Sequence, residues 1–129
     1  MILLDTHVWF YWVNDNIEQL SQPALKSMQT NATMAVSIIS CWEIAMLVSK
    51  NRLRLSLDVQ YWINQALKYP RIKLMDIDPE IVVLSTRLPG EFHSDPADRL
   101  IVATCMKHAI PLVTKDQKIH AWQNIKTIW

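Results

Sequence analysis

Four acidic residues stand where predicted strands end or predicted helices begin, and together they could bind a metal ion. They are Asp5, Glu43, Asp98 and Asp116. Asp5 and Asp116 each follow an apolar run, whereas Glu43 and Asp98 fall in the expected first turns of helices. In a parallel α/β sheet, the strand carboxyl ends and the helix starts that follow them gather at one edge. We therefore expect the four carboxylates to share one crevice.

Such a cluster of carboxylates has a definite chemical use. Two like charges about 4 Å apart repel by roughly 1 kcal/mol in water and by about 4 kcal/mol at an effective dielectric constant near 20. Three or four of them therefore need protons or a cation. Mg²⁺ and Mn²⁺ take oxygen ligands and keep several waters, which suits a site whose other ligands are phosphate oxygens. Such an ion polarises a phosphoryl oxygen and lowers the pKa of water. The acids thus indicate metal-assisted phosphodiester hydrolysis.

Each acid also has a purely structural interpretation. Glu43 completes a Ser-x-x-Glu capping box, which would satisfy backbone N–H groups at a helix start. Asp98 in a first turn would favour the helix dipole, and Asp95 is a natural N-cap. Asp116 could simply begin a turn. Asp5 is the hardest to explain in this way, because a carboxylate that ends a buried strand is costly unless it is paired.

Neighbours of the acids could support the site. Thr6 and Thr114 lie close to acids and could orient water or metal ligands through their hydroxyls, although a role in turns is equally open. His7 and His93 have no partner at metal-ligand spacing, which favours a structural or solvent-facing role.

A basic segment follows the helix that carries Glu43. Lys50, Arg52 and Arg54 could contact the phosphates of a nucleic acid, although a solvated connection between two helices explains them equally well. The six tryptophans are better explained as core or subunit-contact residues than as a platform for base stacking.

Strands and helices alternate along the chain. Apolar runs predict strands at residues 2–4, 34–37, 72–77 and 112–114, and a final edge strand at 126–128. Helical spacing and start signals predict helices at 8–13, 24–30, 40–51, 57–69, 81–87 and 96–109, and a short helix or turn at 116–122. Pro96 suits the first position of its helix, because its missing N–H would be unpaired there anyway. The alternation is typical of a parallel sheet with helices on both faces.

Length and composition exclude several classes of protein. Residues 1–129 have the length of one domain, and half of them are apolar, which excludes disorder of the whole chain. No apolar run approaches the roughly 20 residues that cross a bilayer, and an acid at the fifth position argues against a signal peptide. We therefore expect a cytoplasmic protein. A single glycine, Gly90, excludes glycine-rich nucleotide-binding loops.

Charge and cysteine content add two further expectations. The net charge of +1 gives no global sign of nucleic-acid binding, so an anionic partner must be held locally. Cys41 and Cys105 form neither a disulfide framework nor a zinc motif, and we expect both to be buried free thiols.

Four motifs of the chain, in order, resemble those of PIN domains. They are Leu-Leu-Asp5-Thr-His, Ser-x-x-Ser-x-Trp-Glu43-Ile, His-x-Asp-Pro-x-Asp98-Arg-Leu-Ile-x-Ala and Leu-Val-Thr-x-Asp116. The resemblance covers the chain from end to end and is strongest to the small VapC-like toxins. It implies a three-layer α/β/α sandwich around a parallel sheet of four to five strands. It also implies an endoribonuclease that depends on Mg²⁺ or Mn²⁺.

The same resemblance implies roles for individual residues. Asp5 and Asp98 would be the principal metal ligands, and Glu43 and Asp116 would complete the acidic set, partly through water. Asp95 belongs to the Asp-Pro-x-Asp variant of the third motif and would stand close to the metal.

The resemblance also implies partners. Arg99 would pair with an acid or with a phosphate. An RNA substrate, a second copy of the chain in a homodimer and a small cognate antitoxin are implied, and no membrane is. PIN domains also include RNA-processing nucleases without a toxin role, which leaves that alternative open.

Two other functional classes can be weighed from the residues. A phosphoacceptor signalling domain would use Lys115, but it needs an acidic pair after the first strand, where only Asp5 stands, and an acceptor after the third, where only Asp76 and Asp78 are available. A nonenzymatic domain that binds RNA or an antitoxin would gain nothing from concentrated negative charge facing RNA.

Overall fold

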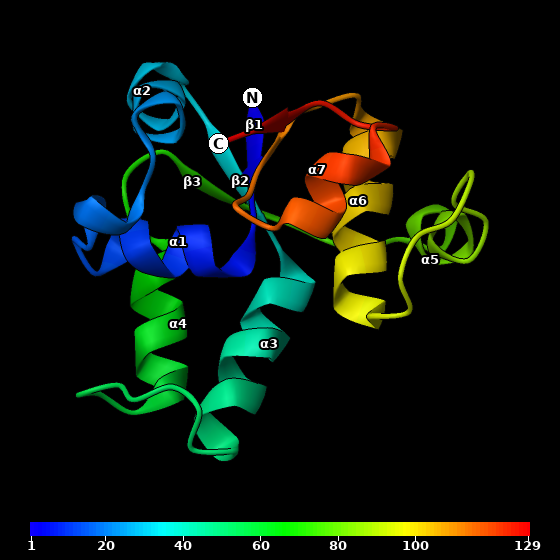
Figure 1. Cartoon of the computed structure of the whole chain (residues 1–129). Helices are drawn as coiled ribbons and strands as arrows, with labels where there is room; N and C mark the ends of the chain where they lie inside the picture. The colour runs from blue at the N-terminus through cyan, green and yellow to red at the C-terminus, as the bar shows by residue number, and fades with distance from the viewer.

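The computed structural model describes all 129 residues and centres them on a five-stranded sheet (Figure 1). The strands are β1 (Ile2–Leu4), β2 (Met34–Ser37), β3 (Ile72–Met75), β4 (Leu112–Val113) and β5 (Thr127–Ile128). Their order across the sheet is β3-β2-β1-β4-β5, and every neighbouring pair is parallel. Leu4 of the central strand pairs with Val36 on one side and Val113 on the other. Asp5 therefore follows β1 at the middle of the carboxyl edge of the sheet.

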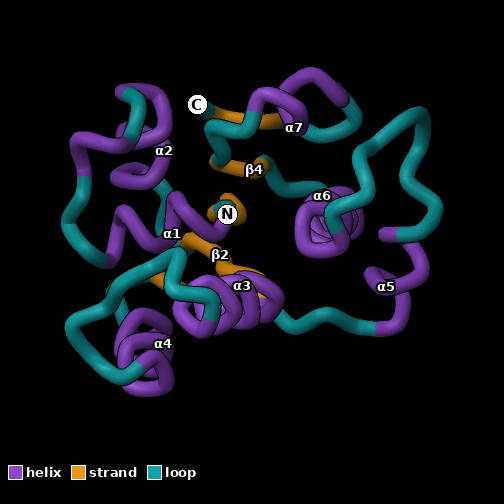
Figure 2. Tube along the Cα trace, turned by 60° about the horizontal axis from the view of Figure 1, so that its bottom comes forward, coloured by secondary structure: helices purple, strands orange, loops and turns teal.

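Seven α-helices and one 3₁₀ helix connect the strands. They are α1 (Thr6–Val13), η1 (Ile17–Gln19), α2 (Gln22–Thr30), α3 (Ile38–Ser49), α4 (Val59–Leu67), α5 (Pro79–Ser85), α6 (Pro96–His108) and α7 (Gln117–Trp122). Figure 2 shows α1, α2 and α4 on one side of the strands and α5 and α6 on the other. The expected α/β/α layers and parallel sheet are confirmed.

Alternate residues of the central strand serve two separate cores. Leu4 packs in a core with Trp9 of α1, whereas Leu3 packs on the opposite face with Ile101 of α6. All four side chains are fully buried. Successive side chains of a strand point to opposite faces, so a strand covered on both sides must be apolar throughout. This is the reason for the unbroken apolar run before Asp5.

Most helices begin after a residue that caps them, although α1 begins at Thr6, two residues before the predicted start. Outside α3, a backbone N–H of the first turn donates to the side chain of each capping residue, namely Asp5, Ser21, Asp58, Asp78, Asp95 and Asp116. Pro96 takes the first position of α6, as predicted. The caps explain why three of the acids at the sheet edge, Asp5, Asp95 and Asp116, have fixed positions.

The start of α3 differs from the prediction. Ser37 caps this helix by accepting a 3.2 Å hydrogen bond from the Ile39 N–H, and the helix begins at Ile38. Ser40 lies inside the helix and is buried. Ser37 and Ser40 are both suitable N-cap residues. Because β2 ends at Ser37, the helix can begin at the next residue, and Ser37 rather than Ser40 becomes its cap. Glu43 therefore lies in the second turn of α3 rather than the first.

Other differences are small. Strand β3 ends at Met75 rather than at residue 77, α4 is shorter at both ends than predicted, and η1 was not predicted. Cys41 and Cys105 are buried free thiols, as expected, and burial raises the pKa of Cys41 to about 11. None of the helices combines the length and the apolar character that spanning a membrane would require.

Candidate active site

Asp5 has hydrogen bonds on both oxygens of its carboxylate. The Thr6 backbone N–H donates to Oδ1 at 2.9 Å, and the Thr114 hydroxyl donates to Oδ2 at 2.6 Å. The N–H of Asp5 donates to the Val113 carbonyl at 3.0 Å, which extends the pairing of β1 with β4. Each carboxylate oxygen has further lone-pair capacity. Asp5 is therefore held in one orientation and can still bind a cation.

Glu43 reaches the same edge from the second turn of α3. The Thr6 hydroxyl donates to Glu43 Oε1 at 2.6 Å and is also hydrogen-bonded to Ser40 Oγ at 2.8 Å. Thr6 is the buried first residue of α1, and because its N–H bonds Asp5 while its hydroxyl bonds Glu43, it links the two acids. The interpretation of Glu43 as a capping-box residue is wrong, because Ser37 is the cap of α3.

Asp98 comes from the first turn of α6. Its N–H donates to Asp95 Oδ1 at 3.1 Å, so Asp95 is an N-cap that also stands at the pocket. Asp98 Oδ2 lies 3.3 Å from His93 Nε2. One ligand atom from each of His93, Asp98 and Asp116 falls within 4.8 Å of the other two. The loop before α6 thus gives His93 the acidic neighbours that sequence spacing did not reveal.

Asp116 begins α7 and is positioned by Thr114. The Asp116 N–H donates to Thr114 Oγ1 at 3.1 Å, and the Lys118 N–H donates to Asp116 Oδ1 at 2.9 Å. His120 Nε2 lies 2.6 Å from the Thr114 carbonyl, and its Nδ1 lies 2.8 Å from the Thr127 hydroxyl. Because a carbonyl only accepts, Nε2 donates to Thr114, and Nδ1 of the neutral imidazole accepts from the Thr127 hydroxyl. His120 therefore connects the end of β4 to β5 by hydrogen bonds.

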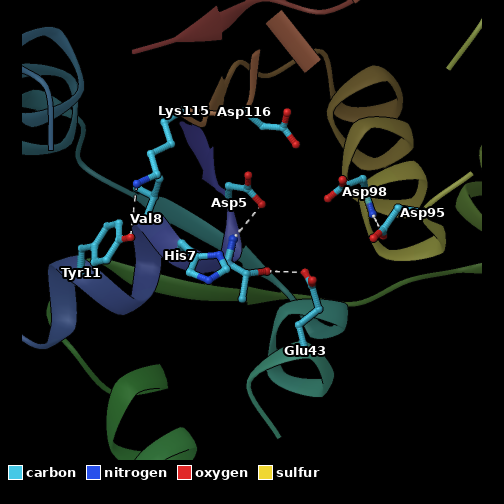
Figure 3. A pocket seen from close by; sticks show the side chains of 10 residues that line it. Asp5, His7, Val8, Tyr11, Glu43, Asp95, Asp98, Lys115 and Asp116 are labelled. Atoms are coloured by element: carbon cyan, nitrogen blue, oxygen red, sulfur yellow. Dashed lines mark hydrogen bonds between the residues drawn. The ribbon is translucent and has the colours of Figure 1, made fainter. Parts of the chain in front are cut away.

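The four predicted acids surround one pocket of about 530 Å³ (Figure 3). Its lining residues are Asp5, Thr6, His7, Val8, Tyr11, Glu43, Asp95, Asp98, Lys115 and Asp116. Figure 3 shows the carboxylates arriving from the end of β1, from α3, from the start of α6 and from the segment after β4. The carboxylates share one crevice, as the predicted strand and helix ends required.

Burial and mutual repulsion raise the pKa of three carboxyl groups. Burial raises the pKa of Asp98 to about 8, and the charges of the other four carboxylates in the pocket add to this shift. Burial also raises the pKa of Asp5, although the hydrogen bond from Thr114 acts in the opposite direction. The pKa of Glu43 is raised first by burial and then by the charge of Asp5. Without a cation, the pocket retains protons that a cation would displace.

The donor set fits a hard divalent cation. Five carboxylates line the pocket, and the nearby imidazoles of His7 and His93 are outnumbered by oxygen donors. Mg²⁺ and Mn²⁺ prefer oxygen ligands, whereas structural zinc sites draw mainly on cysteine and histidine. A divalent cation would also relieve the repulsion that adds to the effect of burial on the pKa of Asp98.

Arg99 pairs with backbone carbonyls rather than with an acid, which corrects the expectation of an acidic partner, and a phosphate contact stays a prediction. Its guanidinium donates to the carbonyl oxygens of Ser85 at 2.9 Å, Phe92 at 2.9 Å and His93 at 3.1 Å. The side chain does not line the acidic pocket. Arg99 instead ties the loop before α6 to α5, and in this way it holds His93 beside Asp98.

The basic segment after α3 lies apart from the pocket. Lys50, Arg52 and Arg54 are exposed, and none of them lines the pocket. Lys50 follows Glu43 by seven residues, which is about 10 Å along the helix axis. Contact of this segment with RNA stays a prediction.

Sequence reasoning did not assign Tyr11 to the site and considered Lys115 only for another function. Both line the pocket, together with His7. The signal for Tyr11 was its place on the helix that Asp5 caps, four residues after His7 and thus on the same helical face. The signal for Lys115 was its position between Thr114 and an acid.

The acids expected for a phosphoacceptor domain do not meet. Asp78 caps α5 and pairs with Lys107, and Asp76 is exposed. Neither lines the pocket that contains Asp5. The phosphoacceptor alternative therefore lacks an acceptor beside its other acid.

Comparisons with known proteins agree with this geometry. The family model described as "PIN domain" matches residues 2–123. Ribonuclease VapC22 of Mycobacterium tuberculosis is 33% identical over 130 residues, which cover 99% of this chain and 98% of that protein.

Solved structures show the same fold. The DNA-bound VapBC complex of Salmonella typhimurium matches with a TM-score of 0.70 at 16% identity, over 98% of this chain and 97% of that chain. VapBC2 of Rickettsia felis, bound to a DNA fragment from its promoter, matches with a TM-score of 0.66 at 23% identity, over 98% and 97% of the two chains. Because the family match spans nearly all residues and the four acidic motifs meet in one pocket, the chain belongs to the PIN domain family.

Proposed function

We propose that this protein is a metal-dependent endoribonuclease that hydrolyses RNA phosphodiester bonds with Mg²⁺ or Mn²⁺. The observation that carries the proposal is the gathering of five carboxylates in one pocket, where the pKa of Asp98 is raised to about 8. All five carboxylates can be ionised together only if a cation offsets their mutual repulsion. The 33% identity to a protein named as a ribonuclease supports RNA as the substrate.

The residues have distinct proposed roles. Asp5 and Asp98 hold the cation directly, and Glu43 and Asp116 complete its environment, partly through water. The chemistry that Mg²⁺ or Mn²⁺ supplies when bound is polarisation of a phosphoryl oxygen and a lowered pKa of water. Thr114 keeps one oxygen of Asp5 turned toward β4 by its hydrogen bond.

The remaining site residues orient the acids. Thr6 fixes the other Asp5 oxygen through its N–H and fixes Glu43 through its hydroxyl. Asp95 caps α6 and so places Asp98 in the first turn of that helix. These bonds set the carboxylates before a cation arrives, which lowers the reorganisation that binding requires.

The direct test is RNA cleavage by the purified protein with Mg²⁺, with Mn²⁺ or with a chelator. Asp5→Asn and Asp98→Asn should abolish metal-dependent cleavage, because each removes a charged ligand. Asp76→Asn is the matched control, since Asp76 is an exposed acid after β3 that does not line the pocket. Cleavage that survives in both site variants would contradict the proposal. RNA binding without cleavage, indifferent to chelator, would favour a nonenzymatic binding domain instead.

We further propose that the protein is the toxin of a type II toxin–antitoxin pair and acts in the cytoplasm as a single domain. The name of the 33% identical relative and the toxin–antitoxin complexes among the structural neighbours support this role. Expression in a bacterial host should stop growth, and Asp98→Asn should relieve the arrest. Unimpaired growth on expression of an active enzyme would favour an RNA-processing nuclease without a toxin role.

A homodimer and a small antitoxin are the proposed protein partners. Trp42 on α3 is 56% exposed and Tyr61 on α4 is 54% exposed, which are large fractions for aromatic side chains. Light scattering after size-exclusion chromatography would give the mass of the protein alone. Copurification with the product of an adjacent small gene would test the antitoxin, and a monomer that binds no such product would contradict both assignments.

A further inference from the structure

Lys115 is the only lysine or arginine that lines the acidic pocket. It follows Thr114 at the end of β4 and precedes Asp116, and its side chain is exposed. Its Nζ lies 3.5 Å from the Tyr11 hydroxyl and 5.4 Å from the centroid of the Tyr11 ring. The Lys115 ammonium group is therefore held beside an aromatic ring of α1.

Lys115 has no carboxylate partner, although five carboxylates line the same pocket. The lysine–carboxylate ion pairs of the structure join Lys107 to Asp78 and Glu80, and the acid Asp98 lies beside His93 rather than beside Lys115. Figure 3 shows the Lys115 side chain directed to Tyr11 and away from the acids. An ammonium group has three N–H donors, and Tyr11 accepts only one of them. Donors of Lys115 thus remain open to an anion that enters the pocket.

Tyr11 provides an aromatic surface beside the Lys115 ammonium group. Tyr11 and His7 lie on the same face of α1, their ring centroids are 6.3 Å apart, and both line the pocket. A cation beside an aromatic ring is the combination by which proteins hold single-stranded nucleic acid, because the ring stacks on a base while the cation contacts the backbone. A base inside a duplex is already stacked on both faces and cannot offer one to Tyr11.

We propose that Lys115 and Tyr11 form a subsite for a single-stranded segment of RNA next to the scissile phosphate. Lys115 contacts a backbone phosphate, and Tyr11, with His7 beside it, stacks on an unpaired base. The subsite deepens the proposed nuclease function and rests on it for the identity of the substrate. The new element is the assignment of Lys115 and Tyr11, and it makes Lys115 a group that, beside the metal ion, offsets the repulsion between a phosphate and the acids.

The test measures binding of a fluorescent single-stranded RNA oligonucleotide in an Asp98→Asn background, in which cleavage does not interfere. Adding Lys115→Gln should weaken binding about tenfold at low salt and reduce the slope of log K against log salt by about 0.7, the value for one lost phosphate contact on a single strand. Lys26→Gln is the matched control, because Lys26 is an exposed lysine on α2 outside the pocket. It should leave the affinity and the slope unchanged.

Variants of Tyr11 separate stacking from charge. Tyr11→Ala should weaken binding about tenfold, which is within the range for loss of one stacked base. Tyr11→Phe keeps the ring and should bind within about twofold of the parent. A duplex of the same sequence should bind more weakly than the single strand and should be indifferent to Tyr11→Ala. In the otherwise wild-type enzyme, Lys115→Gln should act mainly by raising KM.

The outcomes distinguish the subsite from the nuclease function. If the wild type does not cleave RNA but Lys115→Gln and Tyr11→Ala lose affinity as stated, the nuclease function fails and the subsite holds. If cleavage needs Asp5 and metal while Lys115→Gln behaves like Lys26→Gln, the subsite is overturned and the nuclease function holds. No binding of single-stranded RNA by the parent, or equal binding of the duplex, would also overturn the subsite.

Discussion

The Thr114 hydroxyl donates a 2.6 Å hydrogen bond to Oδ2 of Asp5, a residue 109 positions away in the sequence. The same hydroxyl oxygen accepts from the Asp116 backbone N–H at 3.1 Å. One buried side chain therefore positions the first and the last of the four acids. Thr6 makes a comparable link between Asp5 and Glu43. The relative positions of these carboxylates thus depend on two neutral threonines.

Thr114→Val should show how much the site depends on that hydroxyl. Valine has nearly the same shape, so the core stays filled while both hydrogen bonds are lost. We expect kcat for RNA cleavage to fall about 10- to 100-fold, as for other groups that orient metal ligands. We also expect the free energy of unfolding to fall by about 1–3 kcal/mol. Steady-state kinetics and urea denaturation measure the two effects.

Thr114→Ser is the matched control for this experiment, because it keeps the hydroxyl and loses only a methyl group. It should retain most of the kcat. Thr86→Val, at an exposed threonine after α5, controls for the substitution type away from the pocket. Wild-type kcat in Thr114→Val would contradict the role assigned to this hydroxyl.

The raised pKa of Asp98 predicts how the stability of the metal-free protein depends on pH. The ordinary pKa is 3.8 and the pKa in the folded protein is about 8. Between these values the folded state holds a proton that the unfolded state has lost, so the free energy of unfolding must fall as pH rises from about 4 to 8. Asp98→Asn removes this contribution, and its stabilising effect should therefore be larger at pH 8 than at pH 5.

Chemical denaturation in the presence of a chelator, at a series of pH values, would measure this dependence. Asp76→Asn serves as the control, because the exposed Asp76 should give the same small effect at each pH. An Asp98→Asn variant whose stability runs parallel to that of the wild type over this range would contradict the assignment.

The fold could be predicted from the sequence because its signals are local. An apolar triplet before Asp5 specifies a strand covered on both faces, and an aspartate followed by proline at Asp78 and Asp95 specifies two helix starts. These signals act within a few residues, so they can be recognised without knowledge of the rest of the chain. The error at α3 arose where two serines, Ser37 and Ser40, gave the same signal and only the end of β2 decided between them.

The interior of the site was less predictable because its contacts join distant segments. Asp5, Asp98 and Asp116 were found because each ends a strand or opens a helix at one edge of the sheet, whereas Glu43 reaches that edge from the second turn of α3. The carbonyl contacts of Arg99, the approach of His93 to Asp98 and the placement of Lys115 at Tyr11 depend on side-chain direction. No spacing in the sequence encodes those directions.

Arg99→Lys should loosen the loop that carries His93. Arginine donates to three carbonyls of the loop and of α5 in a fork that lysine cannot reproduce. We expect a loss of about 1–3 kcal/mol in the free energy of unfolding and faster amide hydrogen exchange in residues 86–94. The rest of the chain should exchange as before.

Arg87→Lys is the control for this loop, because Arg87 is exposed and makes no side-chain hydrogen bond or ion pair in the structure. It should leave both the stability and the exchange pattern unchanged. Unaltered exchange of residues 86–94 in Arg99→Lys would show that the loop is held by its apolar contacts alone.

Addition of Mg²⁺ or Mn²⁺ should stabilise the protein, because a cation that binds only the folded state adds its binding free energy to that of folding. At a concentration 100 times the dissociation constant, the gain is about 2.7 kcal/mol. Protons on the carboxyl groups whose pKa is raised compete with the metal ion. The affinity for Mg²⁺ or Mn²⁺ should therefore increase as pH rises toward 8. Calorimetric titration at pH 6, 7 and 8 would measure the affinity, and a thermal melt would measure the gain. Asp5→Asn should lose most of the gain and Asp76→Asn should keep it; an equal gain in both would place the cation outside this pocket.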